Sequence, residues 1–403
     1  MFPDRVLSGM RPTGRMHIGH YHGALKNWVR LQDDYDCFYF VADWHALTTH
    51  YEDREVIERN VYDMVVDWLA AGIDPERSTI FIQSRLPEHA ELFTLLAMGT
   101  PLGWLERVPT YKDQMEKLKD RDLATYGFLG HPLLQAADIL IYKAAFVPVG
   151  EDQASHVELT REVARRFNHL YGRASDFDAQ VAAALAKLSK DDARYYERQR
   201  RAYGETGTPE ALAKGEAVVA RAQGAVAGFG ADDAELLLGH LRGAGKTILP
   251  EPRALHTEVT KLPGLDGAKM SKSYGNAIAM REEPAEVTRK IRTMPTDPQR
   301  VRRSDPGNPE RCPVWQFHLV YSDQSTRDWV WKGCTTAGIG CLECKQPVID
   351  AILAEQKPWR ERAAAYLANP KQVHWIVEVG TERARTIARE TMREVREAMG
   401  LSY

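Results

Sequence analysis

The sequence of 403 residues has no long apolar run and no excess of charge of one sign. A membrane-spanning helix needs ~18 consecutive apolar residues, so we expect no membrane association. The first residues lack the basic and then apolar pattern of a secretory signal, which predicts a cytoplasmic protein. The sequence has 53 Lys and Arg against 56 Asp and Glu, a formal net charge of −3. This excludes a chain that is basic overall, so any contact with nucleic acid would need a local basic face.

Cysteine is also scarce, with five residues in the whole chain. Cys37 lies in an apolar stretch that predicts a buried strand, which favours an inert core thiol. The other four are separated by gaps of 21, 6 and 2 residues: Cys312, Cys334, Cys341 and Cys344. Disulfides are rare in a reducing compartment, so clustered thiols favour a metal site. Four cysteines suit Zn²⁺ or a [4Fe–4S] cluster, which this spacing does not separate, and four unrelated thiols remain the alternative.

The organisation of the chain follows from its hydrophobic pattern. Short apolar runs predict strands near 6–8, 38–41, 80–82 and 146–150, and the intervening apolar periodicity predicts helices. Strands joined by crossover helices predict an α/β fold: a Rossmann-like, doubly wound parallel sheet with a helical insertion and a C-terminal helical domain. Such sheets bind ligands beyond the carboxyl ends of their strands.

The length suggests two or three domains of about 150 residues each. We assign residues 1–172 to the first part of the Rossmann-like domain, 173–250 to the helical insertion, 251–280 to the second part and 281–403 to the helical domain. The last helix is predicted to run roughly from 382 to 399 and to stop at Gly400. The function of the insertion is not legible from its sequence.

A first candidate site begins at the predicted start of the first helix, with the string His17-Ile18-Gly19-His20. A helix N-terminus offers free N–H groups and the positive end of the helix dipole, which suit a phosphate. Imidazoles at positions i and i+3 can donate to phosphate oxygens from one helical face. Gly19 has no side chain, so a flat base could lie against the backbone there. The alternative is an exposed histidine pair without a role.

A second candidate site is a polar loop flanked by Gly267 and Gly275, with the string Lys269-Met270-Ser271-Lys272-Ser273. Two ammonium groups and two hydroxyls on a loop bounded by glycines suit a mobile phosphate clamp. The alternative is a solvated basic loop.

In this order, the two strings resemble the HIGH and KMSKS signatures of the class I aminoacyl-tRNA synthetases. Four further stretches are similar to the tryptophanyl-tRNA synthetases: Ser-Gly-Met-Arg-Pro-Thr-Gly at 8–14, Ala-Asp-Trp-His-Ala at 42–46, Leu-Gln-Ala-Ala-Asp-Ile-Leu at 134–140 and Val-Pro-Val-Gly-Glu-Asp-Gln at 147–153. The resemblance covers about 1–172 and 251–403 and leaves the insertion outside. It implies an enzyme that activates L-tryptophan with ATP and Mg²⁺ and transfers it to tRNA(Trp), as a homodimer whose helical C-terminal domain contacts the tRNA.

The resemblance also implies roles for individual residues. The catalytic residues would be His17, His20, Lys269 and Lys272. The residues that bind ATP would be Arg11, Thr13, Gly14, His17, Gly19, His20, Lys112, Gly150, Asp152, Gln153, Lys269, Met270, Ser271 and Lys272. The residues that bind tryptophan would be Leu7, Ser8, Gly9, His45, His131, Gln135, Asp138, Val147, Val149 and Gln153.

Amino-acid choice is expected to depend on Asp138. The matching family residue accepts the indole N–H, a group that can only donate. The alternatives for Asp138 are a helix N-cap or a surface carboxylate. Many family members have Tyr where this chain has His131 and Met where it has Gln135, so the polarity of the pocket differs. The corresponding segment of the similar tyrosyl enzymes usually reads Gln-Gly-x-Asp, which makes a tyrosyl-tRNA synthetase the nearest alternative.

The resemblance extends to the four cysteines. A subset of the family binds a [4Fe–4S] cluster through a motif that matches the last two cysteine gaps here and differs by one residue in the first. It therefore favours [4Fe–4S] over Zn²⁺ on Cys312, Cys334, Cys341 and Cys344. A non-catalytic paralogue that binds RNA or senses redox state is a further alternative, against which both intact signature strings argue.

Overall fold

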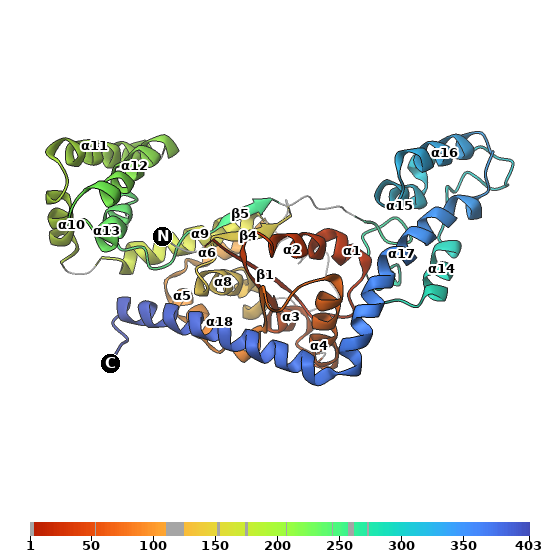
Figure 1. The fold of residues 1–403 in the computed structure, drawn as a ribbon, viewed down its shortest axis with the longest axis horizontal. Coiled ribbons are helices and arrows are strands. Elements are labelled where there is room, and N and C mark those ends of the chain that lie inside the picture. Colours follow the sequence, from red (N-terminus) through yellow and green to blue (C-terminus); the bar gives the residue numbers. More distant parts are fainter. Residues whose placement is uncertain are drawn as a thin grey trace. The chain divides into compact units, whose positions relative to one another are not determined.

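The chain folds into an α/β structure whose helices cover a parallel sheet (Figure 1). The computed structural model describes residues 4–52, 54–109, 125–150, 154–173, 176–206, 208–243, 245–256, 262–271 and 274–403. Two compact units are distinguished. Unit 1 comprises Met1–Ser8, Leu86–His256 and Glu382–Tyr403, and unit 2 comprises Gly9–Arg85 and Thr257–Thr381. Within the described ranges, no helix is both long and apolar enough to span a membrane.

The sheet contains five strands in the order β3-β2-β1-β4-β5. They are β1 (Arg5–Met10), β2 (Asp36–Val41), β3 (Ser78–Ile82), β4 (Phe146–Val149) and β5 (Arg253–His256). Strands β1 and β4, β2 and β3, and β4 and β5 pair in parallel, with Val6 opposite Phe146 and Cys37 opposite Ser78. The order reverses beside β1, which is where such sheets bind ligands. The predicted α/β class and its first four strands are confirmed.

The apolar runs explain the central strands. Every residue of β3, and all of β2 after its first residue, is buried, as in parallel strands covered on both faces. Cys37 is fully buried in β2, as predicted. The fifth strand, β5, was not predicted because prolines at 250 and 252 precede a short sequence with exposed ends.

The helices of unit 2 begin with α1 (Ile18–His20), which continues as a π-helical turn η1 (Tyr21–Leu25) and then as α2 (Lys26–Leu31). Next come α3 (Asp43–His50), α4 (Arg54–Ala71) and the short η2 (Gln83–Arg85). The later elements are α14 (Pro284–Thr293), η5 (Pro309–Arg311), α15 (Pro313–Tyr321), α16 (Gln324–Thr335) and α17 (Cys341–Ala368). Helix α17 packs against α4, α14 and α15.

In unit 1, α8 (Tyr126–Ile141) packs between α5 (Glu88–Gly99) and α9 (Ala154–Tyr171), with α6 (Leu102–Glu106) also against it. The last helix, α18, runs over Pro370–Ala398. The sequence-based start near 382 was therefore wrong, because proline is favourable in the first helical turn, where its missing N–H is not needed. The stop at Gly400 is confirmed: this residue has a φ of 73°, and the N–H of Leu401 donates to the carbonyl of Arg396.

The described part of residues 173–250 contains four helices that share a hydrophobic cluster of their own. The helices are α10 (Phe177–Ala186), α11 (Lys190–Thr206), α12 (Pro209–Ala225) and α13 (Ala231–Leu241). The chain enters and leaves this bundle side by side, where the N–H of Lys246 donates to the carbonyl of Gly172 at 2.7 Å. A Cβ atom on Gly245 would overlap that carbonyl, so only glycine fits where the two segments lie side by side. The four domain ranges given above stay a prediction.

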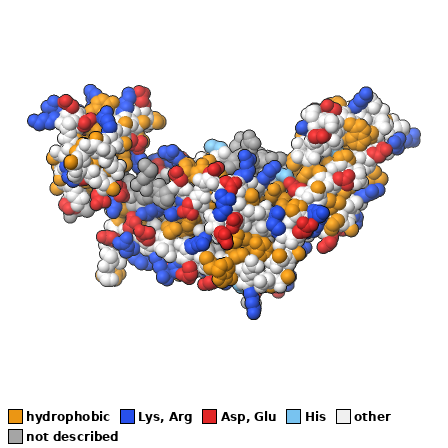
Figure 2. All heavy atoms as spheres, in the orientation of Figure 1, with side chains coloured by type: hydrophobic (Ala, Val, Ile, Leu, Met, Phe, Trp, Pro, Cys, Tyr) orange, Lys and Arg blue, Asp and Glu red, His pale blue; other side chains and the backbone are white. Residues whose placement is uncertain are grey.

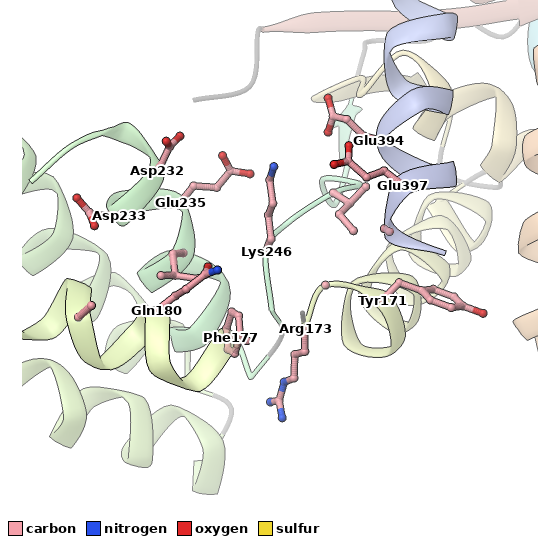
Figure 3. A pocket seen from close by; sticks show the side chains of 15 residues that line it. Tyr171, Arg173, Phe177, Gln180, Asp232, Asp233, Glu235, Lys246, Glu394 and Glu397 are labelled. Atoms are coloured by element: carbon pink, nitrogen blue, oxygen red, sulfur yellow. The ribbon is translucent and has the colours of Figure 1, made fainter. Parts of the chain in front are cut away.

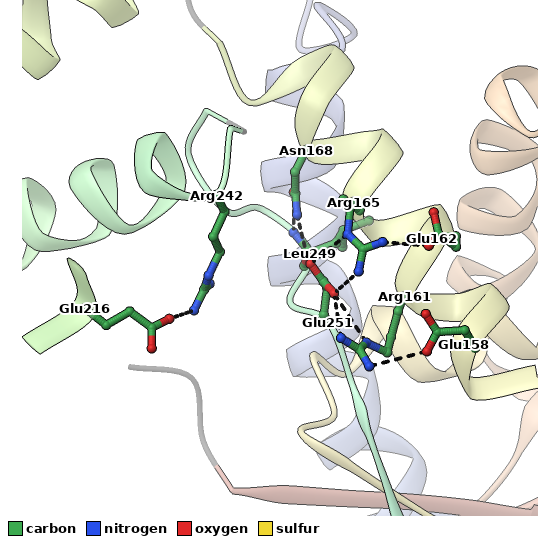
Figure 4. A network of polar contacts seen from close by, with 9 residues as sticks. All are labelled: Glu158, Arg161, Glu162, Arg165, Asn168, Glu216, Arg242, Leu249 and Glu251. Atoms are coloured by element: carbon green, nitrogen blue, oxygen red, sulfur yellow. Dashed lines mark hydrogen bonds and ion pairs between the residues drawn. The ribbon is translucent and has the colours of Figure 1, made fainter. Parts of the chain in front are cut away.

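The segment that returns from the bundle to β5 is fastened to α9 (Figure 4). The Asn168 amide donates to the carbonyl of Leu249 at 2.7 Å and accepts from the N–H of the same residue at 3.0 Å. Glu251 then accepts from the guanidinium groups of Arg161 and Arg165. These bonds satisfy buried backbone groups that would otherwise need water, and they hold the segment that leads into β5 against α9.

Candidate active site

The start of α1 brings two imidazoles together. His17 is the extended N-cap residue, with φ −125° and ψ 166°, and its backbone N–H donates to Nδ1 of His20 at 3.2 Å. The two rings are stacked, with centroids 3.7 Å apart. His17 is buried and His20 is exposed. This geometry places two imidazole rings together at the start of α1, where their ring nitrogens suit phosphate oxygens.

Backbone hydrogen bonds join the start of α1 to residues 278–280, which follow the second string in the chain. The N–H of Ile18 donates to the carbonyl of Ile278, and the N–H of Met280 donates to that of Met16, both at 3.0 Å. His17 and Ala279 form the antiparallel bridge between these two bonds. The short ribbon fixes the first signature string next to the chain that emerges from the second.

Gly19 lies where the two strings meet. A Cβ atom on this residue would lie 3.0 Å from Nδ1 of His17 and 3.4 Å from Sδ of Met270. The first distance is tighter than ordinary carbon–nitrogen contact, so a larger residue would displace the imidazole. Gly19 of the first string and Met270 of the second therefore lie next to each other.

Asn276 holds the second string in shape, and sequence reasoning missed it. Its Oδ1 accepts from the N–H of Ser271 at 2.7 Å, and its Nδ2 donates to Oδ1 of Asp266 at 2.8 Å and to the carbonyl of Lys269 at 3.1 Å. The side chain is buried, at 4% exposure. The only sequence signal was an amide just beyond a glycine at 275, a common arrangement in turns.

The predicted residues of this loop differ in their exposure to solvent. Lys269 is exposed, Met270 is buried and Ser271 is half-buried. The ammonium group of Lys269 is thus in water while the backbone beneath it is bonded to Asn276. Lys272 lies outside the described residues.

The turn after β1 carries further candidates. Arg11 is exposed, Thr13 and Gly14 are half-buried, and the N–H of Thr13 donates to the carbonyl of Arg11 at 2.8 Å. A Cβ atom on Gly9 would lie 2.6 Å from the ring of Phe40, so that ring excludes any other residue. Glycine here lets the strand end lie flat against an aromatic surface.

Three predicted residues share one face of α8, at positions i, i+4 and i+7: His131, Gln135 and Asp138. Oε1 of Gln135 accepts from Nδ1 of His156 at 2.5 Å, and the ring of His131 meets the same imidazole edge to face, with centroids 6.1 Å apart. His156 lies on α9 and was not singled out from the sequence. This face of the helix is therefore polar and rich in imidazole.

Asp138 is fully buried in the last turn of α8. It is neither the N-cap, which is Thr125, nor a surface carboxylate, so the two structural alternatives raised from the sequence were wrong. Its Oδ1 lies 2.6 Å from Nδ1 of His89, and Nε2 of His89 lies 2.7 Å from the hydroxyl of Tyr142. Burial holds the pKa of Tyr142 far above its usual range. The sequence analysis singled out neither His89 nor Tyr142.

The remaining candidates are distributed over several elements. Leu7 is buried and Ser8 half-buried on β1, His45 is buried on α3, and Val147 and Val149 are buried on β4. Gly150 directly follows β4. The other predicted residues lie outside the described part of the chain: Lys112, Asp152 and Gln153.

The four predicted metal ligands come from three neighbouring helices. Cys312 caps α15, Cys334 lies near the end of α16, and Cys341 and Cys344 share the first turn of α17. Burial, and then the nearby thiols of the other three, raise the pKa of Cys344 to about 12. Among the described residues, no three His, Cys, Asp or Glu side chains are placed to hold a metal ion. The metal site on these four cysteines therefore stays a prediction.

A cavity of about 690 Å³ in unit 1 is lined by residues of the insertion and of the end of α18. Figure 3 shows Lys246 between Asp232 and Glu235 on one side and Glu394 and Glu397 on the other. On the face drawn in Figure 2, basic and acidic side chains alternate, so that face has no field of one sign.

Comparison with known proteins gives consistent matches. The sequence profile of the family described as tRNA synthetases class I (W and Y) matches residues 3–190 and 234–354. The tryptophan–tRNA ligase of Ralstonia nicotianae is 65% identical over 403 residues, covering 100% of both chains. That of Thermotoga maritima is 44% identical over 401 residues, which are 99% of this chain and 100% of that protein. The crystal structure of tryptophanyl-tRNA synthetase from Campylobacter jejuni, complexed with ADP and tryptophan, matches with a TM-score of 0.70 at 28% identity and covers 98% of this chain and 100% of that chain.

Proposed function

Because the chain belongs to the class I tRNA synthetases of the tryptophan and tyrosine family, we propose that it is a tryptophan–tRNA ligase. It activates L-tryptophan with ATP to tryptophanyl-adenylate and pyrophosphate, and then transfers tryptophan to tRNA(Trp). The observation that carries this function is the meeting of the two signature strings at Gly19, beside Met270. Full-length identity of 65% to a tryptophan–tRNA ligase supports tryptophan over tyrosine.

The activation step needs alignment and charge stabilisation rather than a general base. The carboxylate of the amino acid is already ionised at neutral pH. It attacks the α-phosphorus of ATP, an oxygen–phosphorus bond forms, and pyrophosphate leaves with its negative charge. Mg²⁺ and positively charged side chains stabilise this charge as it develops.

In this proposal, the stacked pair His17 and His20 contacts the phosphates, and Gly19 lies beneath the adenine. Lys269 and Lys272 hold the departing pyrophosphate. The backbone bonds from Asn276 keep the first of these lysines in place while its ammonium group stays in water. The other proposed ATP-binding residues are Arg11, Thr13, Gly14, Lys112, Gly150, Asp152, Gln153, Met270 and Ser271.

Tryptophan is selected through Asp138, which accepts the indole N–H. A site built for such a bond can reject an analogue that lacks the group by ~10⁴–10⁵. His131 and Gln135 share its helical face and make the pocket more polar than in many relatives. The other proposed contacts to tryptophan are Leu7, Ser8, Gly9, His45, Val147, Val149 and Gln153.

We assign a [4Fe–4S] cluster, with Zn²⁺ as the alternative, to Cys312, Cys334, Cys341 and Cys344. Support comes from the chemistry of four thiols as a donor set and from their places on α15, α16 and α17, which pack in part against one another. When bound, the group would cross-link the ends of three helices through thiolate bonds. Anaerobic purification followed by iron, sulfide and zinc analysis tests the assignment. Loss of the metal is expected in Cys341→Ser, whereas full metal content in that variant would contradict the ligand set.

The proposed partners are tRNA(Trp) and a second copy of the chain. Sedimentation or light scattering of the purified protein tests for the homodimer, and a monomeric mass at assay concentration would contradict it. The function itself is tested by aminoacylation of total tRNA with labelled tryptophan or tyrosine, with periodate-oxidised tRNA as the control. Acid-precipitable tryptophan is expected. Charging with tyrosine alone would contradict the proposal.

A further inference from the structure

The proposed amino-acid contact, Asp138, is the acceptor at the end of a buried chain of polar groups. Oδ1 of Asp138 lies 2.6 Å from Nδ1 of His89, and Nε2 of the same imidazole lies 2.7 Å from the hydroxyl of Tyr142. His89 and Tyr142 are fully buried, as is Asp138. The three groups come from the first turn of α5, from α8 and from the residue that ends α8.

The positions of the protons in these two hydrogen bonds follow from the chemistry of the three side chains. An ionised carboxylate can only accept hydrogen bonds, so the proton in the 2.6 Å contact belongs to Nδ1 of His89. In a neutral imidazole with its proton on Nδ1, Nε2 is the acceptor for the hydroxyl proton of Tyr142, a group that burial keeps protonated. The bond made by one ring nitrogen fixes the tautomer at the other.

This arrangement decides what Asp138 can recognise. Burial disfavours the charge of a carboxylate, so each hydrogen bond that a buried carboxylate accepts favours its ionised form. A protonated Asp138 would present a donor to the substrate and would no longer prefer a group that can only donate. A charge-assisted donor at Nδ1 keeps the carboxylate ionised and fixes the plane of its two oxygens.

We propose that His89 is a positioning residue for amino-acid selection, held in its tautomer by Tyr142, and that it keeps Asp138 an oriented acceptor for the indole N–H. This inference rests on the proposed function and deepens it. The competing explanation is that the contact only ties α5 to α8, which pack against each other.

A substrate pair separates the two explanations. Tryptophan is compared with β-(1-benzothiophen-3-yl)-alanine, which has nearly the same shape but carries sulfur in place of the indole N–H. The readout is the ratio of kcat/KM for these two amino acids in ATP–pyrophosphate exchange. We expect the unmodified enzyme to favour tryptophan by on the order of 10⁴.

Three variants of the chain test the positioning role. His89→Leu removes the donor to Asp138, and the ratio should fall about 10- to 100-fold, the usual effect of one charge-assisted bond. His89→Asn keeps a donor near the position of Nδ1, whereas His89→Gln places its amide near Nε2. The asparagine variant should therefore retain more of the ratio than the glutamine variant.

Tyr142→Phe removes a single oxygen and keeps the donor to Asp138. Because it weakens only the control of the tautomer, the ratio should fall by about 3- to 10-fold. The KM for ATP should stay unchanged in every variant. Thermal unfolding identifies a variant that does not fold. If His89→Leu is such a variant, the asparagine–glutamine pair and Tyr142→Phe still decide the question.

Equal losses for both amino acids in all folded variants would overturn the inference and leave a purely structural contact. A selective loss for tryptophan would support it. Failure of the proposed function gives a different result, since the unmodified protein would then show no exchange with tryptophan at all.

Discussion

The loop that carries Lys269 is predicted to depend on Asn276, whose side chain makes three hydrogen bonds to it and to Asp266. Asn276→Ala removes all three. One such bond contributes about 0.5–1.5 kcal/mol, and water replaces part of each loss at this partly exposed loop, so we expect a total near 2 kcal/mol. If the ordered loop is required in the transition state, kcat should fall about 30-fold, since 1.36 kcal/mol is tenfold.

The assay is ATP–pyrophosphate exchange at saturating ATP and amino acid, with the KM for tryptophan expected to stay unchanged. Asn276→Asp is the matched variant of equal size. Its carboxylate would face that of Asp266 across a contact of 2.8 Å, so the loss should exceed that of the alanine variant. The exchanged pair Asp266→Asn with Asn276→Asp restores a donor and an acceptor at this contact and should recover part of kcat. The reasoning is refuted if Asn276→Ala has full kcat, or if the exchanged pair is no better than Asn276→Asp alone.

Three further predictions concern other parts of the chain. Gly19→Ala would place a methyl group 3.0 Å from Nδ1 of His17 and 3.4 Å from Sδ of Met270. The value of kcat/KM for ATP should therefore fall at least about tenfold, without a change in circular dichroism. An unaltered dependence of the rate on ATP would contradict the importance of this packing. Burial lowers the pKa of His240 from 6.5 to about 4, so between these values the unfolded chain binds a proton that the folded chain does not. The free energy of unfolding should therefore be highest above pH 6.5 and decline by up to about 3 kcal/mol as the pH falls to 4. Thermal melts of His240→Gln should show a smaller decline, and an equal decline would contradict this role of His240. Asp138→Ala should lower kcat/KM for tryptophan by more than about 100-fold while the KM for ATP is kept, and undiminished activity would remove Asp138 from the pocket.

The fold was largely predictable because its central strands are continuous apolar runs. Phe38 to Val41 and Ile80 to Ile82 have no polar residue to obscure their pattern, and both are buried strands. The short edge strand β5 has exposed ends and two prolines before it, so neither alternation nor a long apolar run distinguished it from a loop.

Candidate residues could be singled out where a short string carries its own chemistry. His17, Gly19 and Met270 stand in such strings, and Gly19 lies close to the side chains of the other two. His89 and Asn276 could not be found in this way. Each acts through a partner many residues away or through backbone groups, and only the packing of α5 against α8, or the turn of one loop, creates these contacts.

The central claim is most directly tested by ATP–pyrophosphate exchange, measured with each of the twenty amino acids in turn. The account predicts exchange that depends on tryptophan, with tyrosine and phenylalanine slower by several orders of magnitude. Exchange that depends on tyrosine would keep the family and contradict the proposed role of Asp138. Folded protein without exchange for any amino acid would contradict the proposed activity itself.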